Sequence, residues 1–505
     1  MSTDSQSTGS VYLVGAGPGD PGLITLRGVQ CIASADTILY DYLVNPHILK
    51  HARKDAELLC LGKHGKTRVW SQDEINQTMV NLAMQGKTVV RLKGGDPSVF
   101  AHGAEEATVL AEAGISFEII PGITAALAAA GYAGTALTHR DLASAVALIT
   151  GHENPEKQES LLDYEALARF PGTLVFYMGV TTSKQWVSKL IANGKPANTQ
   201  AIIVRRISCH DQQTIRCTLE EVPARLAGPP AIRPPVLTII GDVAQAPQML
   251  AWFESRPLFG QTILVTRSES QSKGLIDQLE QLGAHVLSQP AIKISKPDSW
   301  TAVDSAISEI DAYDWLVFSS SNGVRYFFER LSELALDARA LSGNKVAAIG
   351  PGTARTLSEF NISADLIPDE YRAESLVESL KPHAVQGERF LLLRASRGRE
   401  VLTEGLRSAG GKVDQVVVYN SNDIGSLLPE IEQKIESGEV TLVTVTSSAI
   451  ARSVMNLLGT HAETIQFASI SPITSETLRG LGKSPEIEAS EYTMDGLVSA
   501  ICDNS

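Results

Sequence analysis

A glycine-rich stretch near the beginning of the chain has residue types that could hold a nucleoside-bearing cofactor. In "LVGAGPGDPGLITLRG", Gly17, Gly19 and Gly22 satisfy the pattern G-x-G-x-x-G directly after a short apolar run. Asp41 follows about twenty residues later, where a ribose-binding carboxylate lies in dinucleotide-binding folds. The pattern therefore fits a nicotinamide enzyme, but it fits other nucleoside ligands as well.

Two prolines inside this stretch argue against a phosphate ligand. Pro21 has no N–H and Pro18 has a fixed φ, so the loop lacks donors that a pyrophosphate needs. Asp20 followed by Pro21 is typical of an N-cap and a first helical position, which predicts a carboxylate at the helix start. Because that charge repels phosphate, the loop suits a ligand without phosphates, such as S-adenosylmethionine.

A second glycine-rich loop, "RLKGGDPSVF", supports this interpretation. Gly94 and Gly95 allow the backbone to approach a ligand closely, and Asp96 could accept a hydrogen bond from an ammonium group or a ribose. A third stretch, "PGITAALAAAGYAGTALTHRD", puts a Pro-Gly turn before Thr124 and Ala125 and continues with small residues. Each stretch alone is also typical of an ordinary strand-to-helix turn or a small-residue helix.

Charge and composition bound the possible partners. The formal net charge of −14 disfavours nucleic acid, whereas local basic clusters leave room for an anionic small substrate. Side chains that could pair with substrate carboxylates are Lys63, His64, Lys66, Arg68, His139 and Arg140. Each of them could equally belong to a solvated surface loop.

The length and the cysteines indicate a multidomain protein of a reducing compartment. The 505 residues exceed the size of one core, and no apolar run approaches the about twenty residues of a membrane span. The polar N-terminus lacks a signal-peptide pattern, and the five cysteines are scattered without C-x-x-C. We therefore expect a cytoplasmic protein with reduced thiols, no membrane partner and no metal site.

Alternating strand-like and helix-like runs predict an α/β fold in the first half. One helix, "SQDEINQTMVNLAMQG", begins with a capping box formed by Ser71 and Glu74. A Pro-rich loop, "AGPPAIRPP", precedes the last strand, and a fresh strand starts at "QTILVTRSES". We expect a disordered tail over 1–10, a first domain over 11–250, a linker over 251–260 and a second domain over 261–503.

The second half contains a weak internal repeat. "WLVFSSSNGVRYFF" resembles "TLVTVTSSAIARSV", "AAIGPGTARTL" resembles "ASISPITSETL", and "YRAESLVESL" resembles "YTMDGLVSAI". The repeat predicts two similar α/β lobes with a ligand site between them. Because "TILVTRSE" precedes both copies, one lobe is expected to be discontinuous, with the chain crossing between lobes at "QPAIKI" and "DQVVVYN".

Taken in order, the motifs of the first half resemble those of the tetrapyrrole methylases, and among them the uroporphyrinogen-III C-methyltransferases. The resemblance rests on "VGAGPGDPGLITLRG", "LYDYLV", "LGKHGK", "QDEINQ", "VVRLKGGDPSVFAHGAEE", "PGITAA", "ALTHRD", "LVFYMG" and "PPVLTIIGDV". It implies two α/β lobes with S-adenosylmethionine between them, methylation of uroporphyrinogen III to precorrin-2, and a homodimer formed through this half.

This resemblance also implies roles for individual residues. It places the proton acceptor at Asp41, which is then no ribose ligand, and the proton donor at Lys63. The implied cofactor contacts are Pro18, Gly94, Gly95, Asp96, Val99, Thr124, Ala125, Met178 and Ile207. Two positions depart from the family pattern. Tyr42 replaces an arginine, and Ile207 replaces a glycine, so that an added Cβ is expected to crowd the cofactor.

The second half resembles the uroporphyrinogen-III synthases through the repeat and through "VFSSSNGVR", "LLLRASRGRE", "VVVY" and "EYTMDGL". That family closes linear hydroxymethylbilane into uroporphyrinogen III while inverting the last pyrrole, without a cofactor. The resemblance implies Tyr419 as a proton donor. The substrate contacts that it implies are Arg267, Ser319, Ser320, Ser321, Asn322, Thr353, Arg394, Ser447 and Ser448.

Two other interpretations of the sequence are possible. One is a different corrin-pathway methylase fused to a non-catalytic two-lobed ligand-binding module. The other is a nicotinamide dehydrogenase fused to such a module, which the prolines of the first loop and the G-G-D-P sequence oppose.

Overall fold

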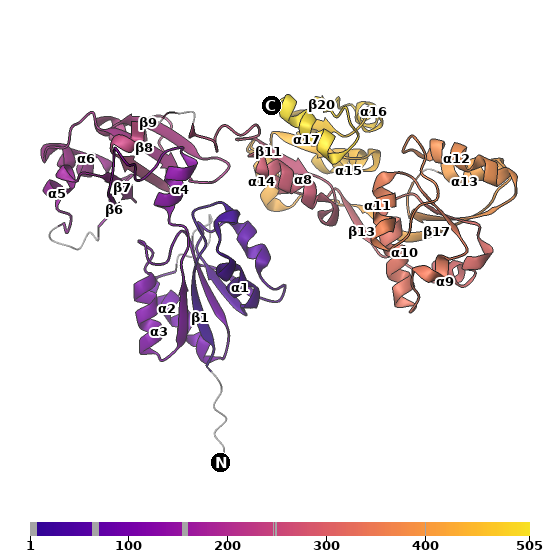
Figure 1. The fold of residues 1–505 in the computed structure, drawn as a ribbon, viewed down its shortest axis with the longest axis horizontal. Coiled ribbons are helices and arrows are strands. Elements are labelled where there is room, and N and C mark those ends of the chain that lie inside the picture. Colours follow the sequence, from indigo (N-terminus) through magenta and orange to yellow (C-terminus); the bar gives the residue numbers. More distant parts are fainter. Residues whose placement is uncertain (1–7, 63–69, 154–159, 246, 248–249, 399) are drawn as a thin grey trace, which may run out of the picture. The chain divides into compact units, whose positions relative to one another are not determined.

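The computed structural model describes residues 8–62, 70–153, 160–245, 247, 250–398 and 400–505 (Figure 1). The chain divides into two compact units. The first contains Met1–Gln261 and Leu282–His285, and the second contains Thr262–Gln281 and Val286–Ser505. Each unit is built from two five-stranded sheets with helices packed against them, which confirms the two-lobed α/β fold class that the sequence predicts.

A parallel sheet organises the first lobe of the first unit. Its strand order is β3-β2-β4-β1-β5, and the neighbouring strands are parallel. The strands are β1 (Ser10–Gly15), β2 (Thr37–Tyr40), β3 (Glu57–Cys60), β4 (Val89–Lys93) and β5 (Ser116–Ile120). One face is covered by α1 (Leu26–Ser34) and the other by α2 (Gln72–Met84) and α3 (Gly103–Glu112) (Figure 1).

This strand order decides between the two interpretations of the glycine motif. In dinucleotide-binding folds, strand 1 lies between strands 2 and 4. Here β1 lies between β4 and β5, and β2 pairs with β4. The G-x-G-x-x-G loop therefore follows a strand of a different topology, and the nicotinamide interpretation loses its structural basis.

Two predicted helix starts in this lobe can be compared with the structure. The capping box of α2 is confirmed, because the Glu74 amide donates to the Ser71 hydroxyl at 3.2 Å and the Ser71 amide donates to the Glu74 carboxylate at 2.9 Å. The predicted helix start at the glycine loop is wrong in part. Asp20 caps only the 3-10 turn Pro21–Leu23, and α1 begins separately, with Thr25 as its N-cap.

The second lobe of the first unit has a mixed sheet of order β6-β7-β10-β8-β9. Strands β6 and β7 are parallel, whereas β10 is antiparallel to β7 and β8, and β9 is antiparallel to β8. The strands are β6 (Val146–Thr150), β7 (Thr173–Tyr177), β8 (Gln200–Arg205), β9 (Gln213–Thr218) and β10 (Val236–Ile240). The helices are α4 (Ala125–Tyr132), α5 (Tyr164–Arg169), α6 (Ser183–Ala192) and α7 (Val222–Ala227).

Residues 250–261, here called the junction segment, pack onto this lobe where the sequence predicts a linker. Phe253 and Leu258 are buried. Gly134 adopts φ +66°, and a Cβ there would lie 2.3 Å from the carbonyl carbon of Leu250, so the two backbones touch. The junction segment is thus part of the first unit.

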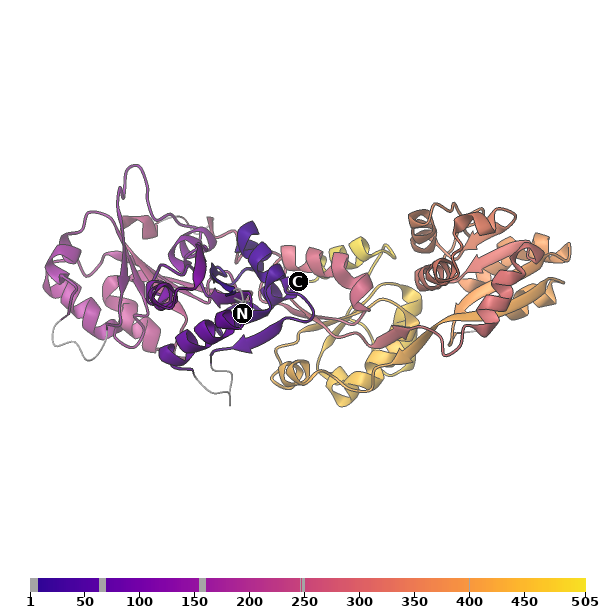
Figure 2. The same cartoon turned by 90° about the horizontal axis from the view of Figure 1, so that it is seen from below.

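Two sheets also organise the second unit. One has the order β13-β17-β16-β14-β15 and consists of β13 (Ile292–Ser295), β14 (Trp315–Phe318), β15 (Lys345–Ala348), β16 (Arg389–Ala395) and β17 (Lys412–Asp423). The other has the order β12-β11-β18-β19-β20 and consists of β11 (Thr262–Val265), β12 (His285–Ser288), β18 (Leu442–Val445), β19 (Gln466–Ser469) and β20 (Ile487–Glu488). The second sheet is discontinuous in sequence, as the repeat predicts, and the crossing segments are β13 and β17 (Figure 2).

Helices flank both sheets of the second unit. Those of the continuous lobe are α9 (Thr301–Ser308), α10 (Ser321–Glu333), α11 (Pro351–Glu359), α12 (Ala373–Val385) and α13 (Val401–Ser408). Those of the discontinuous lobe are α8 (Glu269–Gln281), α14 (Pro429–Glu436), α15 (Ser448–Leu458), α16 (Pro472–Gly480) and α17 (Met494–Asp503). No helix among the described residues is both long and apolar enough to cross a membrane.

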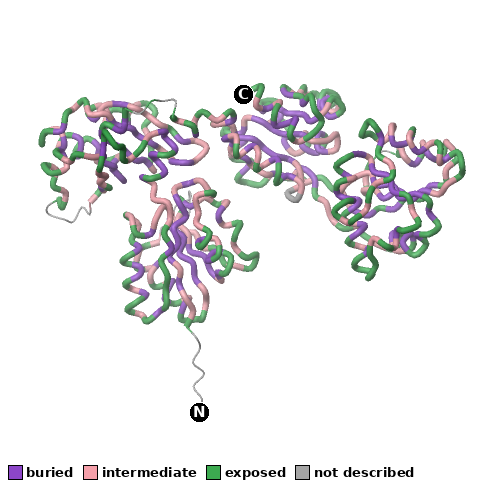
Figure 3. Tube along the Cα trace, viewed as in Figure 1, coloured by how far each residue is buried: buried purple, intermediate pink, exposed green. Residues whose placement is uncertain are grey.

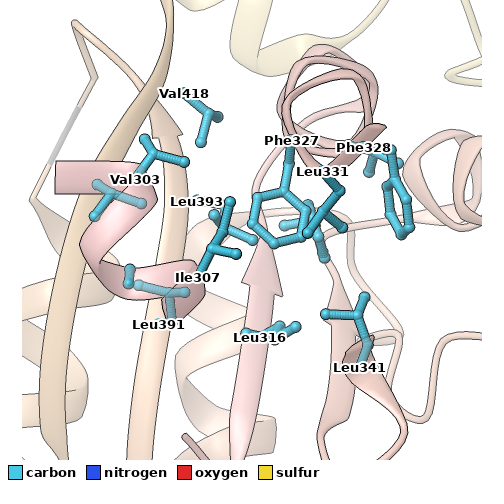
Figure 4. Packing of buried hydrophobic residues seen from close by; sticks show 14 of the residues in the cluster. Val303, Ile307, Leu316, Phe327, Phe328, Leu331, Leu341, Leu391, Leu393 and Val418 are labelled. Carbon is cyan, nitrogen blue, oxygen red and sulfur yellow. The ribbon is translucent and has the colours of Figure 1, made fainter. Parts of the chain in front are cut away.

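Hydrophobic packing holds these helices against their sheets. Phe327 and Leu331 on α10 pack against Leu316 on β14 and against Leu391 and Leu393 on β16 (Figure 4). Each such side chain contributes about 1.5–3 kcal/mol when fully buried. The same pattern recurs along the chain, with buried residues on strands and exposed residues on outer helix faces (Figure 3). The start of α10 is therefore held rigidly at the carboxyl end of β14.

Candidate functional sites

Three loops meet at the carboxyl ends of β4, β1 and β5 in the first unit. The Gly95 amide donates to the Gly17 carbonyl at 2.8 Å, and the Gly17 amide donates back to Gly95 at 3.2 Å. The Gly122 amide donates to Asp96 Oδ2 at 2.9 Å. The carboxyl edge of a parallel sheet is where open α/β folds bind ligands, so the convergence marks a candidate cofactor site.

Glycine is required where these loops touch. A Cβ on Gly15 would lie 2.5 Å from the Gly122 amide nitrogen, and a Cβ on Gly122 would lie 2.2 Å from the Gly95 carbonyl oxygen. Gly95 adopts φ +70°, which other residues rarely accept. Gly94 is less constrained, because its nearest neighbour would be the Leu43 side chain at 3.6 Å.

Asp96 has a different role from the one that its sequence suggests. Its Oδ1 accepts from the Ser98 amide at 2.7 Å, and its Oδ2 accepts from the Gly122 amide at 2.9 Å. Each oxygen keeps a second lone pair for a ligand. The carboxylate thus joins two of the loops, and a ligand contact would be additional to this structural task.

The second lobe contributes a tyrosine that the sequence analysis missed. The Tyr177 hydroxyl lies 2.8 Å from Thr124 Oγ1 and accepts from the Ala126 amide at 2.9 Å. It therefore caps α4 and ties the end of β7 to the third loop. Met178 follows Tyr177 in the chain, adopts φ +52° and is half exposed. The family motif "LVFYMG" is the signal that could have pointed to Tyr177.

Ile207 lies in the core of the second lobe, and the crowding of the cofactor that its Cβ is expected to cause stays a prediction. Its side chain is buried in the hydrophobic cluster with Ala126 and Ile239, and Val99 and Ala125 pack against the same cluster. What approaches the first loop is the backbone, because a Cβ on Gly19 would lie 2.7 Å from the Ile207 carbonyl oxygen. Pro18, which precedes Gly19, is thereby brought to the same place.

Asp41 belongs to a buried ionic network that the sequence analysis did not identify. Arg91 Nη2 lies 2.6 Å from Asp41 Oδ1, and Arg91 Nε lies 3.1 Å from Glu106 Oε1. Lys93 Nζ donates to the same Glu106 oxygen at 2.7 Å. Arg91, Lys93 and Glu106 are buried, whereas the Asp41 carboxylate is about one-third exposed. Asp41 is thus the solvent-accessible member of this network.

The alternation of side chains between the two faces of β4 could have revealed this ionic network. Arg91 and Lys93 are two residues apart in a buried strand, so both side chains leave the same face and need a carboxylate there. Burial lowers the pKa of the Lys93 ammonium, and Arg91 lowers it further, while Glu106 and Asp41 oppose the shift. The network therefore orients Asp41 through fixed charges rather than through flexible surface groups.

Only two of the six basic residues predicted to bind substrate lie in the part of the chain that the structure describes. Lys63, His64, Lys66 and Arg68 lie outside the described residues. His139 and Arg140 lie on an exposed turn whose hydrogen bonds are internal, with His139 and Ala143 exchanging backbone bonds and the Asp141 amide donating to the His139 ring at 3.2 Å. Tyr42, at the position that departs from the family, is about half exposed and packs on Gly62.

A pocket of about 550 Å³ marks the candidate site of the second unit. It lies between the lobes, and residues of β13 and α10 line it together with Ile424, which directly follows β17. They include Ser268, Lys293, Asn322, Arg325, Tyr326 and Glu329. Of these, only Asn322 is among the residues predicted from the sequence. Lys293 and Arg325 are the cations that an acidic substrate would meet.

Hydrogen bonds connect this pocket to several predicted residues. The Tyr419 hydroxyl lies 3.0 Å from Ser320 Oγ, which also caps α10 by accepting from the Gly323 amide at 3.0 Å. Gln271 Nε2 donates to Asn322 Oδ1 at 2.7 Å and thereby joins α8 to α10. Arg267 Nε donates to the Gln271 side chain at 3.1 Å.

The other predicted residues of this unit have local partners. The Ser319 hydroxyl donates to the Leu393 carbonyl, and the Ser321 hydroxyl donates to the Gly352 carbonyl beside buried Thr353. In the discontinuous lobe, Ser447 caps α15 as Ser320 caps α10, and Ser448 accepts from the Thr477 hydroxyl at 2.9 Å. The repeat thus places equivalent serine caps in both lobes.

Arg394 is not brought to the pocket. Its guanidinium pairs with Glu400 and donates to Gln415 and to the Gly398 carbonyl, both at 3.2 Å. Gln415 also accepts from the Thr403 hydroxyl on α13, so Arg394 stabilises the side of β16 that faces this helix.

Two α/β units, each with polar groups gathered at a site of its own, define a bifunctional enzyme of small-molecule metabolism. Residues 10–223 match the family model of the Tetrapyrrole (Corrin/Porphyrin) Methylases, and residues 273–499 match that of Uroporphyrinogen-III synthase HemD. The chain belongs to the tetrapyrrole methylases through its first half and to the uroporphyrinogen-III synthases through its second half. It is therefore a tetrapyrrole methyltransferase joined to a synthase of porphyrin biosynthesis.

Individual relatives cover one or both halves. Porphyrin biosynthesis protein HemD from Ruminiclostridium josui is 35% identical over 441 residues, which are 87% of each chain. Uroporphyrinogen-III C-methyltransferase from Bacillus subtilis (strain 168) is 39% identical over 340 residues, which are 67% of this chain and 69% of the relative. Siroheme synthase 1 from Yersinia enterocolitica is 45% identical over 259 residues, 51% of this chain and 54% of the relative.

Solved structures resemble one half each. Uroporphyrin-III C-methyl transferase from Thermus thermophilus, complexed with S-adenyl homocysteine, is 37% identical and covers 47% of this chain and 99% of its own, with a TM-score of 0.41. A mutant uroporphyrinogen III synthase, also from Thermus thermophilus, is 16% identical and covers 48% of this chain and all of its own, with a TM-score of 0.38.

Proposed function

We propose that the first half transfers methyl groups from S-adenosylmethionine to uroporphyrinogen III to give precorrin-2. The observation that carries this proposal is the contact between the three glycine-containing loops at one sheet edge, with Asp41 on the neighbouring strand end. The acidic cap Asp20 at the first loop fits a cofactor without phosphates. S-adenosylmethionine, when bound, supplies the methyl group.

The protein groups would handle the protons of the reaction. Methylation of a pyrrole carbon requires that ring protons leave and return, and Asp41 is a partly exposed carboxylate held in place by Arg91. We assign it as the proton acceptor, and we keep Lys63 as the proton donor from the family resemblance. The contacts proposed for the cofactor are Pro18, Gly94, Gly95, Asp96, Val99, Thr124, Ala125, Met178 and the backbone at Ile207.

Equilibrium binding separates this function from its alternative. We expect the protein to bind S-adenosylhomocysteine in calorimetric titration and to show no heat of binding with NAD. Binding of NAD alone would contradict the methyltransferase proposal. A methylase of a later corrin intermediate would bind the same cofactor but would leave supplied uroporphyrinogen III unmethylated.

Replacing Gly122 by alanine is expected to weaken S-adenosylhomocysteine binding by about tenfold or more. The added Cβ would lie 2.2 Å from the Gly95 carbonyl oxygen and would force the two loops apart. Calorimetry measures the effect. Gly343→Ala, in the second unit, is the control, because a Cβ there meets no atom within 4 Å. An unchanged affinity of the Gly122 variant would show that these loops do not hold the cofactor.

We further propose that the second half closes hydroxymethylbilane to uroporphyrinogen III in the pocket between its lobes. The pocket supports this, because Lys293 and Arg325 line it beside Asn322. We propose these two cations as partners of the substrate carboxylates in place of Arg394, together with Arg267 and the serine caps. The protein's main task would be to fold and hold a flexible chain, and we expect no cofactor in this half.

Tyr419→Phe is expected to lower the synthase rate by about 100-fold if the hydroxyl donates a proton. Burial raises the pKa of the Tyr419 phenol, while its hydrogen bonds with Ser320 and Asn322 and the charge of Arg397 oppose the shift. The phenol therefore stays protonated from about pH 6 to 9, and the rate should be flat there as far as Tyr419 is concerned. Isomer-resolved chromatography across this range tests both statements. A loss of less than about twofold would reduce Tyr419 to a structural residue.

The proposed partners are tetrapyrroles and a second copy of the chain. We expect a homodimer through the first half, as the family resemblance implies, with Leu26 on α1 and Phe117 and Ile119 on β5 as exposed apolar candidates for its surface. The Arg27–Glu118 pair places these two elements side by side. Sedimentation of the wild type and of Leu26→Lys tests this proposal.

A further inference from the structure

The junction segment is attached to the end of α4 by specific contacts. The rings of Trp252 and Phe253 lie 5.2 and 4.6 Å from the ring of Tyr132. The Trp252 indole N–H donates to the Gly131 carbonyl at 2.9 Å. Arg256 stacks over both aromatic rings. A merely connecting chain would need none of these contacts.

One arm of contacts leads from these rings to the first glycine loop. The Tyr132 hydroxyl donates to Asp20 Oδ2 at 2.6 Å, and Asp20 Oδ1 accepts from the Gly22 amide at 2.7 Å. Tyr132 is buried. Burial, reinforced by Asp20, raises the pKa of Tyr132, so the hydroxyl remains a donor at neutral pH. The position of the Tyr132 ring therefore sets the position of the Asp20 carboxylate.

A second arm of contacts leads from Glu254 to Asp20. Glu254 Oε1 accepts from Gln212 Nε2 at 2.9 Å and from the Thr214 hydroxyl at 2.5 Å. Gln212 Oε1 accepts from the Ser208 amide at 2.8 Å, and the Ser208 hydroxyl accepts from the Asp20 amide at 2.9 Å. Gln212 and Ser208 are buried, and Ser208 adopts φ +58°. This strained conformation persists because the surrounding hydrogen bonds hold it.

We infer that Tyr132 and Glu254, together with the rings of Trp252 and Phe253, position the first cofactor loop. The two arms end on different groups of Asp20, one at its carboxylate and one at its amide. Removal of the Tyr132 hydroxyl takes away its bond to Asp20 Oδ2, and removal of Glu254 leaves Gln212 Nε2 with its longer contacts to the Tyr132 carbonyl at 3.2 Å and to Thr214 Oγ1 at 3.4 Å. Each change therefore weakens the hold on the loop. The junction segment would thus belong functionally to the methyltransferase. This inference rests on the proposed function, in which that loop binds S-adenosylmethionine.

The test compares Glu254→Ala and Tyr132→Phe in the full chain. The phenylalanine keeps the ring packing and removes only the hydroxyl. Matched controls are Glu220→Ala, at an exposed carboxylate, and Tyr164→Phe on α5. We expect each test variant to raise the dissociation constant of S-adenosylhomocysteine about tenfold and to raise KM for the methyl donor with little change in kcat. The isomer composition made by the second half should stay unchanged.

Amide hydrogen exchange of residues 17–22 without ligand supplies a second readout. Exchange should be faster in both test variants and unchanged in both controls. If the wild type fails to bind S-adenosylhomocysteine, the proposed function fails, and the exchange result still decides whether the junction segment holds the loop. Wild-type affinity together with wild-type exchange in both test variants would overturn the inference.

Discussion

Replacing Asp41 by asparagine is expected to slow methylation of uroporphyrinogen III by about two to four orders of magnitude, while binding of S-adenosylhomocysteine stays unchanged. Asparagine keeps the shape and an oxygen that can accept from Arg91, but it cannot take up a proton at neutral pH. Arg91 remains paired with Glu106, so the variant should fold. Single-turnover methylation measures the loss.

Asp55→Asn is the matched control for this substitution. Asp55 is an exposed carboxylate that also pairs with an arginine, Arg53, and it lies outside the proposed site. Its variant should methylate at the wild-type rate. If Asp41→Asn instead lost cofactor affinity and kept turnover of bound substrate, Asp41 would be a cofactor ligand, and the proposed proton transfer would be wrong.

Removing the second unit is expected to switch the ring isomer completely from type III to type I. Residues 262–505 alone should convert hydroxymethylbilane to the type III isomer without any cofactor. Residues 1–261 alone should methylate supplied uroporphyrinogen III but should leave hydroxymethylbilane to close spontaneously to type I, because nothing then holds the last pyrrole inverted. Chromatographic separation of the isomers gives the result. Type I alone from fragment 262–505 would contradict the synthase proposal.

The division point matters in this experiment. A fragment of residues 1–250, which follows the boundary expected from sequence, lacks Trp252, Phe253 and Glu254, so both arms lose the end that lies in the junction segment, while Tyr132 and Ser208 remain bonded to Asp20. We expect it to bind S-adenosylhomocysteine more weakly than fragment 1–261. Equal affinities would show that the junction segment does not contribute.

Local chemistry and periodicity explain what could be predicted without coordinates. The capping box at Ser71 depends on residues three positions apart. The loop glycines indicate close contacts between backbones, because glycine has no Cβ. The repeat of the second half predicted a discontinuous lobe, because two copies of one pattern imply two copies of one structure. Asp20 shows the limit even of local signals, since it caps a short turn rather than α1.

Residue types that lie close together in the chain were enough to indicate the two families, the α/β class and the loops that carry the motifs. Which distant residues meet could be read only from the folded chain. Four findings depend on how separate segments come together. They are the ion pairs of Arg91 and Lys93 with Glu106, the packing of Ile207 into the core, the ion pair of Arg394 with Glu400, and the hydrogen bonds that link Glu254, Gln212 and Ser208. Burial favours a partner for each polar group, and the fold rather than the spacing along the chain determines which partner is within reach.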